Sequence, residues 1–213
     1  MTVHQQKQFV PQSSESGLTI IECLVAMLIV SILMAVIAPM VALSVGTRVQ
    51  ARRVERATQA ARAYIDGVSA GTIAAPAQTA SVPLATNVAA PTSSGSLTCT
   101  TSTTGYCSNI PASSLYCFDF DGGGCSASSP QDLVVQAFRT NQAQNYLLGL
   151  RVYRADGFSN TNPLVKSDST NKRTQATFTG GMGNYKAPLV EMTTEISTDK
   201  PSLSALCTRL GGC

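Results

Sequence analysis

Hydrophobic residues are concentrated in one long run early in the chain. From Leu18 to Val45, Glu22 is the one charged residue. About 20 apolar residues are enough to cross a bilayer as an α-helix. The run is too long for the core of a secretory signal peptide, and no cleavage site of small residues follows it. We therefore predict a membrane-spanning helix over residues 18–45.

The helical pattern continues beyond the apolar run, over residues 46–68. Apolar residues recur there at spacings of three and four, which is typical of one buried face of an amphipathic helix: Val54, Ala57, Ala61, Tyr64 and Val68. No capping signal precedes Gly67. We expect one continuous helix from Leu18 to Asp66, whose second half lies against a globular domain.

Residues 69–98 are rich in Ala, Ser, Thr and Pro and contain no charged residue, which predicts a linker or long surface loop. Strand signals follow within the region 99–213, at residues 115–120, 132–140 and 145–155, and more weakly at 175–180. In the third of these, Leu148, Leu150 and Val152 share one face, and Arg151 and Tyr153 the other. The order of elements predicts an α+β fold, with a small antiparallel sheet packed on the amphipathic helix.

The composition excludes several function classes. The 213-residue chain has 13% charged residues and a net charge of +3, too small to indicate nucleic-acid binding. His4 is its single histidine, so histidine-based catalysis and histidine metal sites have little support. No phosphate-binding loop, zinc-protease motif or serine-hydrolase motif is present. We predict a protein that is not an enzyme and needs no cofactor.

Six of the seven cysteines lie beyond residue 98, and they indicate a disulfide-bearing domain outside the cytoplasm. Their spacings do not match a zinc site of paired CxxC motifs. Fifteen connectivities are possible, and neighbour pairing is our expectation. The candidates are Cys99 with Cys107, Cys117 with Cys125, and Cys207 with Cys213. Cys23 lies in the apolar run, where we interpret it as a small apolar residue.

Glu22 is the unusual residue of the apolar run. An acidic side chain in the middle of a membrane helix costs roughly 2.5–3.5 kcal/mol, and less near an end. Glu22 could be an interfacial residue that is tolerated there, or a carboxylate that awaits a cation. An α-amino group would be that cation if the chain were cut before Leu18.

The stretch "SGLTIIE", residues 16–22, resembles the prepilin signature of type IV pilins and type II secretion pseudopilins. The resemblance implies that a prepilin peptidase removes residues 1–17 by cutting between Gly17 and Leu18, and methylates the new N-terminus at Leu18. It also implies that Glu22 aligns each subunit through the Leu18 amine of a neighbour during filament assembly. Pro39 stands where many pilins have a helix-kinking proline.

The resemblance further implies the partners and the location. The partners are the prepilin peptidase, other pilins or pseudopilins and their assembly platform, and the inner membrane, which the chain spans once before extraction into a filament. The leader carries Lys7 and Glu15, whereas arginines follow the apolar run at positions 48, 52, 53 and 56. Charge counting would place those arginines in the cytoplasm. The cysteines and the resemblance place the head on the periplasmic side, which we adopt.

The arginines at 48, 52 and 56 form a stripe at helical spacing, with a solvated helix face as its simplest interpretation. Contact with lipid headgroups or with acidic groups of neighbouring subunits is the alternative.

The stretch "CFDFDGGGC", residues 117–125, imitates the opening of a calcium loop through Asp119 and Asp121. Its fifth position is Gly123 and its twelfth is Pro130, so the loop is incomplete. We favour a glycine turn closed by Cys117 and Cys125, and no metal site.

More narrowly, the apolar and amphipathic segments together with "YCFDFDGGGCSASSPQDLVVQAFR" resemble PilV-like minor pilins and cyanobacterial pseudopilins of the hormogonium polysaccharide secretion (HpsB-like) type. That resemblance implies polysaccharide export and gliding motility. The alternative is a membrane-anchored binding module, such as an adhesin or a minor pilin for DNA uptake. The head shows no basic patch with interleaved aromatic residues, so we expect no nucleic-acid partner.

Overall fold

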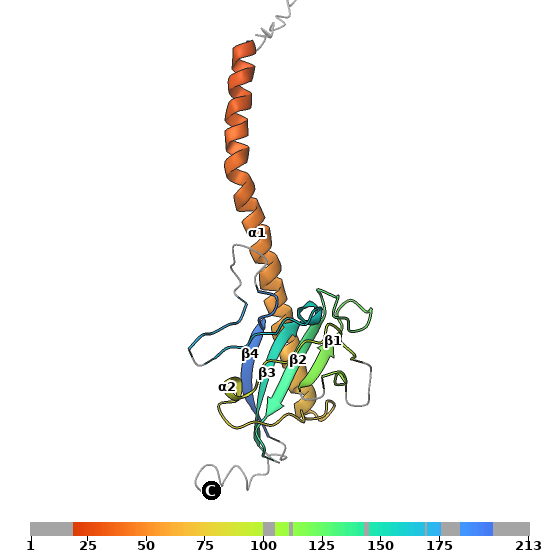
Figure 1. The fold of residues 1–213 in the computed structure, drawn as a ribbon. Helices are drawn as coiled ribbons and strands as arrows, with labels where there is room; N and C mark the ends of the chain where they lie inside the picture. The colour runs from red at the N-terminus through yellow and green to blue at the C-terminus, as the bar shows by residue number, and fades with distance from the viewer. Residues whose placement is uncertain are drawn as a thin grey trace, which may run out of the picture. The chain divides into compact units, whose positions relative to one another are not determined.

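A computed structural model describes residues 19–99, 105–110, 113–142, 145–168, 170–175 and 184–197. The chain forms two compact units, one ending at Ser44 and one beginning at Val45. The described elements are the helices α1 and α2, four β-strands and a short 3-10 helix (Figure 1).

Helix α1, Ile20–Ser69, is continuous through Pro39. It ends beyond the predicted Asp66, because the C-terminal stop is at Gly71 and not at Gly67. Gly71 has φ +73°, a conformation that glycine adopts at little cost, and its N–H bonds to the carbonyl of Val68 at 3.1 Å. Gly67 has another role, since a Cβ there would lie 2.5 Å from Ile73 Cδ1.

The sheet has the strand order β1-β2-β3-β4, and all neighbours are antiparallel. The strands are β1 (Ser114–Phe118), β2 (Leu133–Arg139), β3 (Tyr146–Arg154) and β4 (Val190–Ile196). The α+β fold class is therefore confirmed. Strands β2 and β3 lie within the predicted ranges and β1 begins one residue before its predicted range, whereas β4 was not predicted. The fourth predicted strand is wrong at Gln175, which is not in a strand, and its residues 176–180 lie outside the described part.

The main core lies between the second half of α1 and one face of the sheet. The predicted apolar face of the helix is confirmed, since Ala57, Ala61, Tyr64 and Val68 are buried and Val54 packs against them. Strand residues that alternate with period two complete this core: Leu133, Val135, Ala137, Leu148, Leu150 and Val152.

The opposite face of the sheet is also covered. The short helix α2 (Leu84–Asn87) and Val88 pack there against Phe138, and the 3-10 helix Ala155–Phe158 packs against Tyr153. The segment predicted as a linker is held to β2 by two backbone hydrogen bonds, from Ala80 N to Arg139 O and from Arg139 N to Gln78 O. Residues 78–88 are thus part of the packed head.

Candidate functional site

The first turn of α1 contains the predicted assembly residue Glu22. Thr19 precedes the helix, and its carbonyl accepts from Glu22 N at 3.0 Å and Cys23 N at 3.1 Å. The Thr19 hydroxyl oxygen lies 3.4 Å from Glu22 N. Thr19 and Glu22 have the residue types and spacing of a capping box, a signal that the sequence carries and that our sequence reasoning missed. The carboxylate also lies where the helix dipole favours negative charge. The predicted cleavage residues Gly17 and Leu18 lie outside the described residues.

The large apolar side chains of α1 are exposed from Ile20 to Val45; Ile20 is 83% exposed and Met40 69%. In the described part of the chain, α1 is the helix long and apolar enough to cross a membrane. Pro39 has no N–H, so it withdraws one hydrogen bond from this segment. Cys23 is exposed on the same surface and is not in a disulfide. An unpartnered apolar surface of this extent needs a lipid or protein environment.

Two disulfides lie at the edge of the sheet beside β1. Cys99 is joined to Cys107, and Cys117 to Cys125. These are two of the three neighbour pairs that we expected. The third pair, Cys207 with Cys213, lies outside the described residues.

The acidic loop after β1 brings Asp119 and Asp121 close to Asp132, whose participation sequence reasoning missed. Backbone amides already bond to these carboxylates: Gly122 N lies 2.7 Å from Asp119 Oδ1, and Gly124 N lies 2.8 Å from Asp119 Oδ2. The Ser129 hydroxyl donates to Asp121 and, with the Gly123 amide, lowers the pKa of that carboxyl. These contacts are those of a self-capped glycine turn.

Two tyrosines join α1 to the loop that precedes β1. Tyr106 Oη donates to the carbonyl of Ala74 at 2.7 Å, so the Tyr64 hydroxyl must donate to Tyr106 Oη. Burial raises the pKa of Tyr64, and the neighbouring Tyr106 raises it further. Burial also raises the pKa of Tyr106 to about 12, although its hydrogen bond with Tyr64 acts in the opposite direction.

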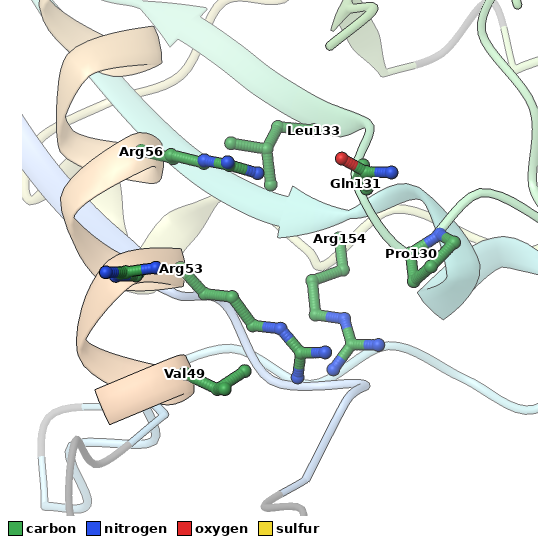
Figure 2. Close-up of a pocket in the computed structure, with 8 residues that line it drawn as sticks. Val49, Arg53, Arg56, Pro130, Gln131, Leu133 and Arg154 are labelled. Carbon is green, nitrogen blue, oxygen red and sulfur yellow. The ribbon is translucent and has the colours of Figure 1, made fainter. Parts of the chain in front are cut away.

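An arginine-lined pocket of about 260 Å³ lies between α1 and the end of the sheet where β2 begins and β3 ends (Figure 2). Four arginines line it, three from α1 and one from β3: Arg52, Arg53, Arg56 and Arg154. The remaining lining residues are Val49, Pro130, Gln131 and Leu133. The sequence showed the helical arginines, but it did not indicate that Arg154 lies opposite them.

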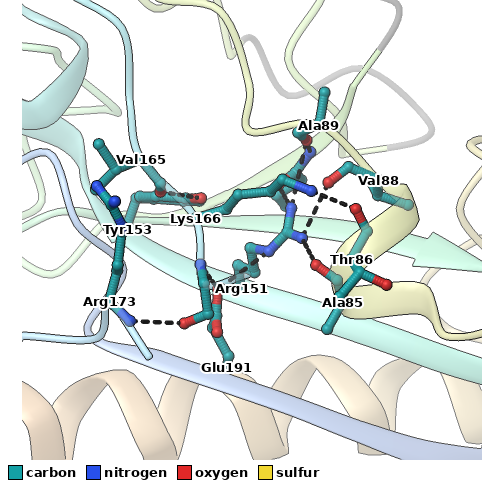
Figure 3. A network of polar contacts seen from close by, with 12 residues as sticks. Ala85, Thr86, Val88, Ala89, Arg151, Tyr153, Val165, Lys166, Arg173 and Glu191 are labelled. Atoms are coloured by element: carbon teal, nitrogen blue, oxygen red, sulfur yellow. Dashed lines mark hydrogen bonds and ion pairs between the residues drawn. The ribbon is translucent and has the colours of Figure 1, made fainter. Parts of the chain in front are cut away.

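Another arginine of β3, Arg151, lies outside this pocket and is 1% exposed. It holds the segment 85–89 on the sheet (Figure 3). Its guanidinium donates to the carbonyl oxygens of Ala85 at 2.6 Å, Val88 at 3.0 Å and Ala89 at 3.3 Å. Gln136 Oε1 accepts a further bond at 3.0 Å, and Glu191 Oε1 lies 3.2 Å from Arg151 Nε as an ion-pair partner. This buried charge is therefore compensated by a carboxylate and four acceptors.

Residues 12–38 match the family model described as the prokaryotic N-terminal methylation motif. No curated protein and no solved structure matches the chain. The motif match supports a membrane-anchored subunit of the type IV pilin or pseudopilin type, which is a substrate of a prepilin peptidase and assembles with other pilins.

Proposed function

We propose that this chain is a minor pilin or pseudopilin, a structural subunit of a type IV pilus-like or type II secretion-like filament. The observation that carries the proposal is the coincidence of the motif at 12–38 with the exposed apolar half of α1. A helix of this kind can lie in lipid before assembly and pack against other copies of such helices afterwards. The subunit acts by assembly, not by catalysis.

Processing after Gly17 supplies the cation for Glu22. Cleavage creates an α-amino group at Leu18, which the peptidase methylates, and the amine of a neighbouring subunit then meets the Glu22 carboxylate. In a water-poor filament core a paired carboxylate is tolerable, whereas an unpaired one is costly. Pro39 would loosen the helix further along.

N-terminal mass spectrometry of the protein from its own cells tests this proposal. The expected mature chain begins at N-methylated Leu18, and cells without prepilin peptidase should accumulate the unprocessed chain. An N-terminus upstream of Leu18 in cells with an active peptidase would refute the proposal.

We further propose that the head lies on the periplasmic side of the inner membrane. Support comes from the two disulfides of the head, because disulfides persist in oxidising compartments. The finer assignment to polysaccharide export and gliding motility is supported by sequence resemblance alone. A deletion strain that exports polysaccharide and glides normally would contradict it, and loss of DNA uptake or surface adhesion instead would favour the alternative of a binding pilin.

A further inference from the structure

The arginine-lined pocket has a charge distribution that calls for an anion. Arg53 extends from α1 toward Arg154 of β3, so that two guanidinium groups lie close together (Figure 2). Arg53 is half-buried, and Arg154 is 7% exposed. Burial lowers the pKa of Arg53, and the charge of Arg154 lowers it further, although Asp156 acts in the opposite direction. Two like charges in a partly desolvated site are unfavourable without a counter-ion.

Internal partners satisfy part of this charge. Arg154 Nε donates to Asp156 Oδ1 at 2.9 Å, and its Nη2 pairs with Asp156 Oδ2. This contact fixes the guanidinium and leaves Nη1 for another acceptor. Within the described residues, no hydrogen bond or ion pair engages the side chains of Arg52, Arg53 or Arg56, and no acidic residue lines the pocket.

The pocket also has an apolar side. Leu133 and Val49 line it together with the arginines, and Val49 is 44% exposed. A ligand that combines an anionic oxygen group with hydrocarbon would therefore fit better than a fully hydrated ion. A volume of about 260 Å³ has room for a group of headgroup size.

The position of the pocket along α1 indicates where such a ligand is available. The apolar run ends at Val45, and Val49 follows four residues later. At 1.5 Å per residue, the pocket begins about 6 Å beyond the end of the apolar run and extends to about 16 Å at Arg56. The headgroup layer of a bilayer extends about 6 Å beyond the hydrocarbon. The Val49 end of the pocket would therefore lie at the depth of the headgroups.

A neighbouring copy of the chain is the less favoured source of the anion. Most of its described acidic side chains already accept hydrogen bonds or pair with arginine: Asp119, Asp121, Asp132, Asp156, Asp168 and Glu191. Entry of one of these carboxylates into a pocket on another copy would cost it such contacts.

We propose that this pocket binds the phosphate group of an anionic phospholipid while the subunit waits in the membrane. Arg53 and Arg154 hold the phosphate oxygens, Arg52 and Arg56 contribute positive charge at the rim, and Val49, the lining residue nearest the apolar run, contacts the glycerol-ester end of the acyl chains. The inference rests on the proposed function in one respect: the apolar half of α1 must lie in a membrane before assembly. A bound lipid would fix the depth at which the head meets the membrane.

The test uses the full chain in phosphatidylcholine nanodiscs with and without phosphatidylglycerol, with bound lipid counted by native mass spectrometry. We expect selective retention of phosphatidylglycerol, and Arg53→Gln should weaken it roughly tenfold or more, as expected for loss of a charge-assisted hydrogen bond. The control is Arg48→Gln, which removes the same charge from an exposed position closer to the apolar run and outside the pocket.

Other outcomes would overturn the proposal. Equal losses from Arg53→Gln and Arg48→Gln would indicate general attraction to a charged surface. Displacement of the lipid by millimolar inorganic phosphate would indicate a free-anion site. If the chain is dimeric and Arg53→Gln makes it monomeric without a change in bound lipid, the pocket binds a second copy of the chain instead. Circular dichroism checks that the variants are folded, and because the unprocessed chain serves equally well, the result does not depend on cleavage after Gly17.

Discussion

At the scale of single residues, Glu22 has two separable roles. Its position in the first turn of α1, three residues after Thr19, favours the start of the helix. Its negative charge serves the proposed pairing with a neighbouring Leu18 amine. A substitution that removes both roles cannot distinguish them, so the side chain must be changed in steps.

Glu22→Gln removes the charge and keeps a residue suited to the third position of a capping box. We expect membrane insertion to persist and incorporation into filaments to fall about tenfold or more, because a charge-assisted hydrogen bond is lost. Immunoblots of membrane and sheared-filament fractions measure both quantities. Glu22→Val should likewise insert into the membrane and fail to enter filaments. Thr19→Val removes the cap and keeps the charge, so it should assemble nearly normally. Normal incorporation of Glu22→Gln would refute the pairing.

The hydroxyl pair of Tyr64 and Tyr106 predicts a loss of stability at alkaline pH. Both pKa values are raised above the ordinary value near 10, so the neutral forms stabilise the fold fully below pH 10. As pH rises from 10 toward 12, the unfolded chain ionises first and the free energy of unfolding falls. Denaturant titrations at pH 8, 10 and 11 should show this fall. It should be smaller in Tyr64→Phe/Tyr106→Phe than in the unsubstituted chain, and an equal fall in the two would contradict the prediction.

At the scale of elements, the two faces of the sheet differ in their buried polar content. The core toward α1 is apolar, whereas the opposite face combines apolar clusters around Tyr153 and Phe138 with the buried Arg151, whose contacts come mainly from backbone carbonyls of residues 85–89. Its guanidinium also lies over the Phe138 ring, 4.9 Å from the centroid. Gly149 leaves room for that ring, since a Cβ there would lie 2.2 Å from it.

Arg151→Met should therefore destabilise the head by about 3–5 kcal/mol, the usual cost of removing one partner from a buried ion pair. Hydrogen exchange should rise in residues 84–89 before it rises elsewhere, because those carbonyls lose their donors. Glu191→Gln is the matched control: its amide oxygen can still face Arg151 and the carbonyl contacts remain. Its cost should be smaller than that of Arg151→Met, which loses the ion pair and the four other acceptors together, and residues 84–89 should stay protected. Equal costs would mean that the ion pair, and not the loop contacts, is the important interaction.

At the scale of the whole molecule, exposed apolar surface and folded core belong to different parts of the chain. The main core begins with residues beyond Val45, and the second compact unit begins there. The long exposed apolar surface precedes it. The head should then hold its fold without the first unit.

A fragment of residues 45–213, exported to an oxidising compartment, should be soluble without detergent and unfold cooperatively. Circular dichroism and thiol counting measure this, and the cysteines at 99, 107, 117 and 125 should be protected from alkylation. The full chain under the same conditions should require detergent. Aggregation of the fragment would mean that the apolar half of α1 contributes to the fold of the head.

Sequence patterns predicted the parts of this fold that follow from apolar periodicity. The helical face at Ala57, Ala61 and Tyr64 and the alternation in β3 could be read directly. Strand β4 could not, because most of its residues are only partly buried and its sequence VEMTTEI has weak alternation. The alternation placed Arg151 on the face opposite Leu150, but no local pattern shows that a loop distant in sequence covers that face. Nor does a local pattern show that Arg154, on the other face, lies opposite the arginines of α1. Asp132 likewise joins Asp119 only through the pairing of β1 with β2.

The two disulfides described above also bear on the order of events during synthesis. Each joins cysteines eight residues apart, so, if the head is exported as we propose, both partners would emerge on the far side of the membrane almost together. Closing so short a loop costs little chain entropy, and a nearby partner competes well against distant cysteines. Correct pairing can then begin while the rest of the head is still being made. β1 would already be flanked by its crosslinks when β2, β3 and β4 arrive in turn to extend the sheet.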